Sequence, residues 1–293
     1  MEIIPLLLVI GSAFIHAFWN MLAKKGRDTL SFLWWSLIFG FAIYSFFFFT
    51  FAYDHDPIPS QGFMFILLSA IFHSMYFTSL GVAYYRGDLS LVYPIARSAP
   101  IFVLILAIWF LGENLSLPGI LGILTVVFGA YIIGFPTFSV THFVRPIRLL
   151  KVLKDRSYQL AWLTALIISL YSVNDKVGVR YVHPFLYLYL VHMLTCILFS
   201  PYVLMRKKAS LFQELKENKS PIILGGIMIP SSYLLILYAM TMGNVSYIVA
   251  VRQLSIVFAV LLGTLLLKEK HGLVRFLASL CIFSGVFLIS YWG

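Results

Sequence analysis

Two arginines lie in the middle of long apolar segments, where they could bind an anion. Arg97 follows Ser90 by seven residues and Arg252 follows Ser246 by six. At about 1.5 Å per helical residue, each arginine is roughly 10 Å inside its segment. An arginine at the centre of a bilayer costs at least ~2.5 kcal/mol, so such residues usually face a cavity. Alternatively, each arginine could hold the free carbonyls of a broken helix or pair with a carboxylate.

No acidic residue lies near the middle of either segment, since Glu113 stands at a segment end. A ligand with a carboxylate or phosphate could therefore meet Arg97, Arg252 or both, because a guanidinium group binds such anions in a bidentate way. Tyr93, Arg97 and Pro100 share one helical face. A proline inside a helix kinks it and frees carbonyl groups, which predicts an interruption next to Arg97.

Polar side chains also form stripes on two other apolar segments. The stripes are Ser12, His16 and Asn20 in the first, and Ser69, His73 and Tyr76 in the third. Such stripes should face protein or water rather than lipid. A histidine there could relay protons, since its unperturbed pKa is about 6.5. A histidine hydrogen-bonded between two helices is the simpler alternative.

Three further positions are candidates with weaker support. Trp19 could form a cavity wall or belong to an interfacial aromatic belt. Tyr233 follows Pro230, which could mark either a binding site or a packing kink. Asp175, beside Lys176, could be a coupling carboxylate or part of a local ion pair. The candidate binding residues are Arg97, Arg252, Tyr93, His16, Asn20, His73, Tyr76, Trp19 and Tyr233, and the candidate coupling residues are His16, His73 and Asp175.

The segments that carry these residues are predicted to be membrane-spanning helices. Of the 293 residues, 61% are hydrophobic and only 11% are charged, compared with roughly 25% charged residues in soluble domains. Stretches of about 20 apolar residues span a bilayer as helices, and the strict alternation of a β-barrel is lacking. We predict an all-α integral membrane protein with ten helices, near 3–23, 30–52, 62–84, 90–111, 117–135, 158–175, 184–205, 221–240, 246–267 and 273–291.

The net charge of +10 comes mainly from short loops, so it indicates membrane topology and not binding to nucleic acid. Most lysines and arginines outside the spans follow odd-numbered spans. Because cytoplasmic loops hold the excess of positive residues, both termini are predicted to face outward across the plasma (inner) membrane. Residues 206–220 would then be a basic cytoplasmic loop.

The chain contains an internal repeat. A shift of 156 residues superposes Gly87 on Gly243, Ser90 on Ser246, Glu113 on Glu269 and Gly129 on Gly285. At this shift Arg97 and Arg252 do not align. We predict a first five-helix repeat at 1–135, a basic cytoplasmic linker at 136–157 and a second repeat at 158–293. An odd number of spans would give the two repeats opposite orientations, as in many secondary transporters.

Several motifs resemble the EamA domains of the drug/metabolite transporter superfamily. They are His16-Ala17-Phe18-Trp19-Asn20, the segment from Arg86 to Arg97, and Leu111-Gly112-Glu113 in the first half, with Tyr171-Ser172-Val173-Asn174-Asp175-Lys176 and Leu267-Lys268-Glu269 in the second. The resemblance covers nearly the whole chain. It implies a ten-helix fold of two inverted repeats that moves metabolites by alternating access.

The resulting prediction is a secondary transporter for a small metabolite that bears a carboxylate or phosphate. A flippase for lipids or their precursors is an alternative, and a membrane enzyme acting on lipid-linked substrates is a weaker one. The sequence has no Gly-x-x-x-x-Gly-Lys phosphate loop, and we expect no cofactor, no metal site and no catalytic residues. The expected partners are a small-molecule substrate and the lipid bilayer, and the chain is compatible with a monomer or a homodimer.

Overall fold

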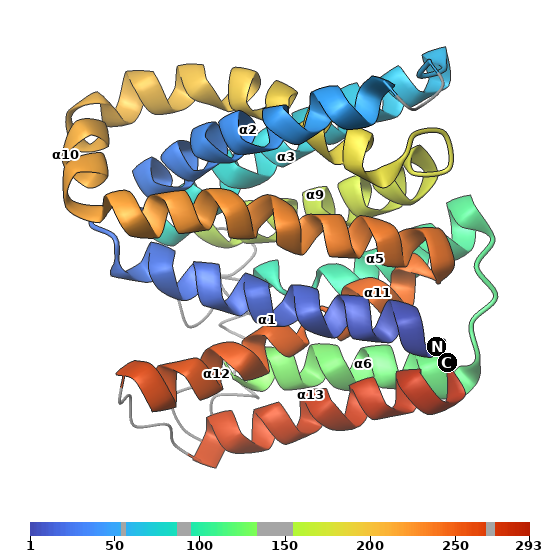
Figure 1. Cartoon of the computed structure of the whole chain (residues 1–293). Helices are drawn as coiled ribbons and strands as arrows, with labels where there is room; N and C mark the ends of the chain where they lie inside the picture. The colour runs from blue at the N-terminus through green and yellow to red at the C-terminus, as the bar shows by residue number, and fades with distance from the viewer. Residues whose placement is uncertain (54–56, 87–94, 134–154, 268–272) are drawn as a thin grey trace.

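The computed structural model of the chain describes residues 1–53, 57–86, 95–133, 155–267 and 273–293. These residues form ten helices and no strand, packed side by side in a bundle (Figure 1). The helices are α1 (Ile3–Lys25), α2 (Thr29–Tyr53), α3 (Ser60–Arg86), α5 (Ala99–Leu111), α6 (Leu117–Ile132), α9 (Arg156–Gly178), α10 (Pro184–Met242), α11 (Val245–Val251), α12 (Leu254–Leu267) and α13 (Leu273–Trp292).

The helix bounds follow the apolar segments of the sequence. In the described part of the chain, seven segments are long and apolar enough to cross a membrane, and α5 and α6 are shorter apolar helices. The helix α9 carries Asp175 and Lys176 near its end and is not among the seven. Two of the seven segments lie in α10, and one combines α11 with α12. The helices are thus consistent with the ten predicted spans in two repeats.

One expected loop is helical instead. Residues 206–220 belong to α10, in which Asn218 is the residue with non-helical backbone angles. Figure 1 shows this stretch as a short helical section that joins the two long arms of α10. Its lysine, glutamate and leucine residues are strong helix formers, and Leu211 and Glu214 are buried. The prediction of a loop at residues 206–220, which relied on their charge, was therefore wrong, because these residues form a connecting helix.

The connecting section of α10 is hydrogen-bonded to the turn between α1 and α2. The buried Glu214 carboxylate accepts hydrogen bonds from the Asp28 backbone N–H at 2.9 Å and from the Asn218 amide at 2.9 Å. Lys207 donates to the Asp28 carboxylate, as does the Ser31 N–H. Burial opposes ionisation of Asp28, but these donors outweigh it, so the pKa of Asp28 lies below its usual value.

Two spans are interrupted by a turn at an arginine. In the second half, Arg252 and Gln253 form a turn between α11 and α12. In the first half, Arg97 and Ser98 form a turn immediately before α5, and residues 95 and 96 are helical. Pro100 occupies the first turn of α5, where a proline loses no helical hydrogen bond. The interruption predicted near Pro100 is present, whereas the second has no proline to signal it.

The two interruptions have the same hydrogen-bond pattern. The Ser98 N–H donates to the Ile95 carbonyl at 3.1 Å, and the Gln253 N–H donates to the Ala250 carbonyl at 3.0 Å. The next bonds, to the carbonyls of Ser98 and Gln253, also correspond. Locally the repeat is therefore shifted by one residue relative to its other matches. With that shift, Arg97 and Arg252 occupy equivalent positions, which the ungapped comparison of the sequence missed.

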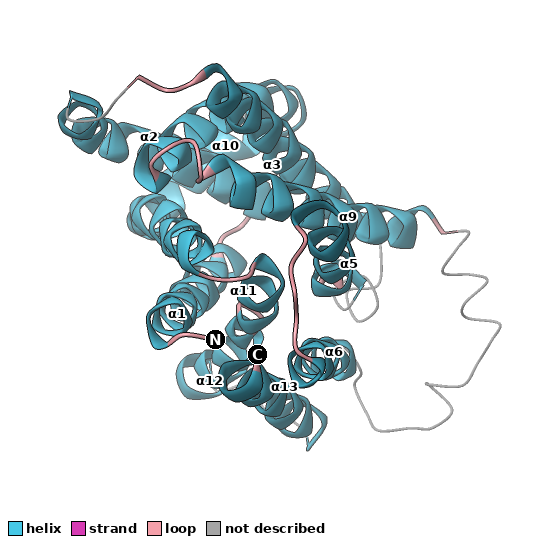
Figure 2. Cartoon of the chain, turned by 90° about the vertical axis from the view of Figure 1, so that its right-hand side faces the viewer, coloured by secondary structure: helices cyan, strands magenta, loops and turns pink. Residues whose placement is uncertain are grey.

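The first helix of each half packs against the fourth span of the other half. The helix α1 contacts α12 and α10, while α9 contacts α5 and α3. Figure 2 shows α6 and α13 side by side at one end of the molecule, and Figure 1 shows the two chain termini next to each other. The helices of the two halves therefore alternate in the bundle, and each half packs its first helix against the other half.

The glycines found by the repeat explain why α6 and α13 approach closely. A Cβ atom on Gly285 would lie 2.6 Å from the Gly122 carbonyl oxygen, and one on Gly129 would lie 2.9 Å from the Ala278 carbonyl oxygen. Under the 156-residue shift, Gly129 corresponds to Gly285 and Gly122 to Ala278. The two contacts are thus related by the repeat itself. Small residues at such positions allow membrane helices to pack backbone to backbone.

The repeated glutamate of the first half holds the start of α11. The Glu113 carboxylate accepts hydrogen bonds from the Val245 N–H at 2.6 Å and from the Ser246 hydroxyl at 2.7 Å. Lys176 donates on the other side of this junction, to the Gly243 carbonyl at 2.8 Å and to the Met240 carbonyl. Lys176 therefore binds backbone carbonyls at the α10–α11 junction and does not form the expected ion pair with Asp175. Glu269, the counterpart of Glu113, lies outside the described residues.

Glu113→Ala is expected to lower the stability of the protein, because it removes the acceptor for the first N–H groups of α11. Loss of a helix N-terminal cap costs about 0.5–2 kcal/mol. Thermal unfolding in detergent should show a lower midpoint for Glu113→Ala than for Glu2→Ala, a matched control at an exposed position. Equal midpoints for the two variants would contradict the capping role.

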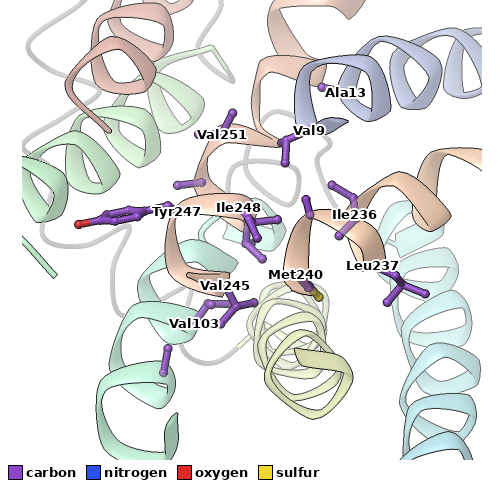
Figure 3. Packing of buried hydrophobic residues seen from close by; sticks show 14 of the residues in the cluster. Val9, Ala13, Val103, Ile236, Leu237, Met240, Val245, Tyr247, Ile248 and Val251 are labelled. Atoms are coloured by element: carbon purple, nitrogen blue, oxygen red, sulfur yellow. The ribbon is translucent and has the colours of Figure 1, made fainter. Parts of the chain in front are cut away.

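The larger of two main apolar clusters gathers side chains from several helices. It includes Val9 of α1, Val103 of α5, Met240 of α10 and Ile248 of α11. Figure 3 shows these side chains converging from the four helices. Polar residues on α1 and α10, such as His16, Asn20 and Tyr233, line the site described next.

Candidate functional site

A cavity of about 460 Å³ lies between the two halves of the bundle. This volume is within the range of ligand pockets, which is about 300–1,000 Å³. Its lining comes from α1, α2, α3, α5, α9, α10, α11 and α12 and from the turns at Arg97 and Arg252. Some of these helices also contribute side chains to the apolar cluster.

The cluster and the lining occupy different parts of α1 and of the second arm of α10. On α1, Val9 and Ala13 belong to the apolar cluster, while the lining begins at His16 and extends to Lys24. On α10, Ile236 and Met240 belong to the cluster, and lining residues precede them. The cavity therefore extends toward the α1–α2 turn and is bounded on the opposite side by packed apolar side chains.

Both arginines predicted from the sequence line this cavity. The Arg252 guanidinium lies 5.4 Å from the centre of the Tyr233 ring, a distance at which a cation is attracted to an aromatic face. The Arg252 Nε atom is buried and has no hydrogen-bond partner among the described residues. No aspartate or glutamate is present in the described lining, so the side chains there give the cavity a positive charge.

The helix α1 contributes His16, Trp19 and Asn20 to the lining. The rings of His16 and Trp19 meet edge to face, with centroids 4.9 Å apart. The Asn20 amide donates to the His16 carbonyl at 2.7 Å, whereas His16 Nδ1 and Trp19 Nε1 are buried without a partner in the described part of the chain. Trp19 thus forms part of the cavity wall.

The helix α3 contributes His73 and Tyr76. The His73 ring stacks on Tyr171 of α9, with centroids 4.3 Å apart, and Tyr76 meets the same ring edge to face. His73 Nδ1 lies 2.9 Å from the Ser69 carbonyl and is therefore the donor in that contact. Because a carbonyl only accepts, the Nδ1 atom of His73 carries a proton in this structure.

Tyr233 connects the cavity to Asp175. Its hydroxyl donates to one Asp175 oxygen, and the Tyr187 hydroxyl donates to the other at 2.7 Å. The Asn174 amide adds a third donor at 3.1 Å. Asp175 is fully buried and does not line the cavity itself. It therefore fixes the orientation of Tyr233 beneath Arg252.

The structure brings eight of the nine candidate binding residues into one cavity. Tyr93 lies outside the described residues. Sequence reasoning did not single out Gln253, Ser255 or Thr195, which also line the cavity. Each has a buried polar atom with no partner among the described residues, as do His16, Trp19 and Arg252. Since buried polar groups are normally hydrogen-bonded, this concentration of unpaired groups indicates a place for a polar ligand.

A family model matches the chain twice, over residues 3–135 and 156–291, and its description is the EamA-like transporter family. The chain belongs to the EamA-like transporter family. Membership makes this a multi-pass membrane protein and a transporter of the drug/metabolite type, with a small-molecule substrate and the lipid bilayer as partners. The match favours neither a lipid flippase nor a membrane enzyme.

The fold of this EamA-like transporter is also found in a solved structure. A crystal structure of another protein has a TM-score of 0.75 with 14% sequence identity, over 99% of each chain. At this identity the similarity concerns the fold alone. The comparison with curated proteins gave no significant match.

Proposed function

We propose that this EamA-like transporter is a secondary transporter for a small organic anion that bears a carboxylate or phosphate. The observation that supports this most is the equivalent position of Arg97 and Arg252, which both line one cavity between the halves. No aspartate or glutamate is among the described lining residues. A bound carboxylate or phosphate pairs with the guanidinium groups, whose planar geometry matches such anions.

Transport occurs by alternating access between two repeats of opposite orientation, with the repeats at 1–135 and 158–293 joined by a basic cytoplasmic linker. The related packing of α1 on α12 and of α9 on α5 supports such an exchange. Both termini face outward in the plasma (inner) membrane, because the basic loops then lie in the cytoplasm. The cavity reaches Lys24 near the end of α1, which lies on the cytoplasmic side in this topology.

Coupling uses groups next to the site. His16 and His73 line the cavity and can exchange a proton with substrate or solvent, while Asp175 acts through Tyr233. A single chain contains both repeats, so a monomer is sufficient for transport, although a homodimer is compatible with it.

The proposal is tested by screening metabolites for thermal stabilisation of the purified protein, since a ligand of the folded state raises its apparent stability. Carboxylates and phosphates are expected to stabilise the protein more than neutral or cationic compounds of the same size. The best compounds are then tested for counterflow in proteoliposomes loaded with the same compound. A set of hits that contains only neutral or cationic compounds would refute the anion site.

A further inference from the structure

The side-chain amide of Gln253 is held in one orientation by the other half of the protein. Its Nε2 atom donates to the Arg97 carbonyl oxygen at 3.4 Å. The opposite orientation of the amide would place two acceptor oxygens against each other. The Arg97 carbonyl therefore determines which end of the amide is the donor, and Oε1 is the end that is left.

The Gln253 Oε1 atom is a buried acceptor without a donor. Gln253 is 6% exposed, it lines the cavity, and Oε1 has no hydrogen-bond partner among the described residues. The neighbouring Arg252 Nε is an unpaired donor in the same lining. One wall of the cavity thus presents a cationic donor and a neutral acceptor that come from adjacent residues.

An anion that carries only acceptor atoms satisfies Arg252 but leaves Gln253 Oε1 unpaired. A buried acceptor that loses water and gains no donor costs free energy, so such an anion is disfavoured. A hydroxyl, amine or amide N–H on the same molecule supplies the missing hydrogen bond. A site of this kind rejects analogues that lack the donor more strongly than a hydrophobic pocket rejects a missing methylene group.

We propose that Gln253 determines substrate specificity by requiring a hydrogen-bond donor close to the anionic group, so that the substrates are hydroxy acids, amino acids or similar donor-bearing anions. The inference rests on the proposed anion site and narrows its substrate class. In this arrangement Arg97 and Arg252 bind the anionic group of the substrate, and Gln253 Oε1 accepts a hydrogen bond from its donor group.

The test compares acids that differ only in the donor. The pairs are lactate with propionate, malate with succinate, and 3-phenyllactate with 3-phenylpropionate. Dissociation constants are measured by thermal shift and calorimetry for the wild type and for Gln253→Met, a side chain of similar length without the amide. Ser279→Ala is the control, because its hydroxyl is buried and unpaired in the described part of the chain but does not line the cavity.

In the wild type, at least one donor-bearing acid is expected to bind about tenfold more tightly than its partner, as one hydrogen bond of ordinary strength implies. In Gln253→Met this ratio falls to about one, mainly through weaker binding of the donor-bearing acid. Ser279→Ala keeps the ratio of the wild type.

Two results would overturn the inference while leaving the anion site intact. One is binding of the acids by the wild type with no preference within any pair. The other is an equal loss of both members of a pair in Gln253→Met, which would mean that Gln253 only supports the structure. If no acid of any pair binds the wild type, the anion site and the donor requirement both fail.

Discussion

Replacing Arg252 by alanine is expected to weaken binding of an anionic ligand by at least about 30-fold. Removing one partner of a buried, hydrogen-bonded charge pair costs about 2–5 kcal/mol, and each 1.4 kcal/mol is about a factor of ten in Kd. Arg97→Ala is expected to act in the same direction, because Arg97 lines the same cavity at the equivalent position. Arg252→Lys keeps the charge but loses the planar fork, so its affinity should lie between those of wild type and alanine variant.

The measurement is calorimetric titration with the acids that stabilise the wild type most. Arg180→Ala is the matched control, since Arg180 is an exposed arginine outside the cavity. It should bind the acids as the wild type does. Normal affinity in both Arg97→Ala and Arg252→Ala would show that the two arginines only hold the interrupted helices together.

Gly285→Ala is expected to destabilise the protein by about 1–3 kcal/mol, the usual cost of overpacking. The new Cβ atom would lie 2.6 Å from the Gly122 carbonyl oxygen, and because that atom belongs to the backbone, α6 and α13 would have to move apart. Gly129→Ala is expected to cost a similar amount, since it meets the corresponding backbone of α13. Thermal unfolding in detergent measures both effects.

Gly11→Ala provides the comparison for these variants. A Cβ atom there would meet only the Leu235 side chain, at 3.7 Å, an ordinary contact. Alanine also has the higher helix propensity, so Gly11→Ala should be at least as stable as the wild type. If Gly285→Ala and Gly11→Ala unfold at the same temperature, the close packing of α6 on α13 is wrong.

The number and approximate ends of the helices followed from hydrophobicity, because a helix that spans a bilayer needs a long apolar stretch and a charged side chain in the bilayer costs free energy. The same rule failed for residues 206–220, where Glu214 is buried through hydrogen bonds that no hydropathy pattern reveals. The turn at Arg252 was also invisible, since no proline or glycine stands there. The turn corresponds to the one at Arg97 only when a one-residue gap is placed in the alignment of the two repeats.

Among site residues, charged and aromatic side chains in apolar spans were the useful signal. Arg97, Arg252, His16 and His73 were found because each is costly in lipid unless it faces protein or water. Gln253 was missed because a glutamine beside an arginine looks ordinary in sequence. Its role depends on which end of its amide faces the Arg97 carbonyl, and that is a property of the assembled helices.

The positive lining of the cavity has an electrical consequence. If the site changes sides while the arginines cross part of the membrane field, the empty and the anion-loaded site carry different charges through that field. One elementary charge moved through the full field changes the free energy by about 2.3 kcal/mol for every 100 mV. A membrane potential that is negative inside the cell would favour the conformation in which the empty, positively charged site faces the cytoplasm. A bound anion would reduce the charge of the site and so weaken this preference. The turnover of the protein would then depend on voltage even if no ion were cotransported.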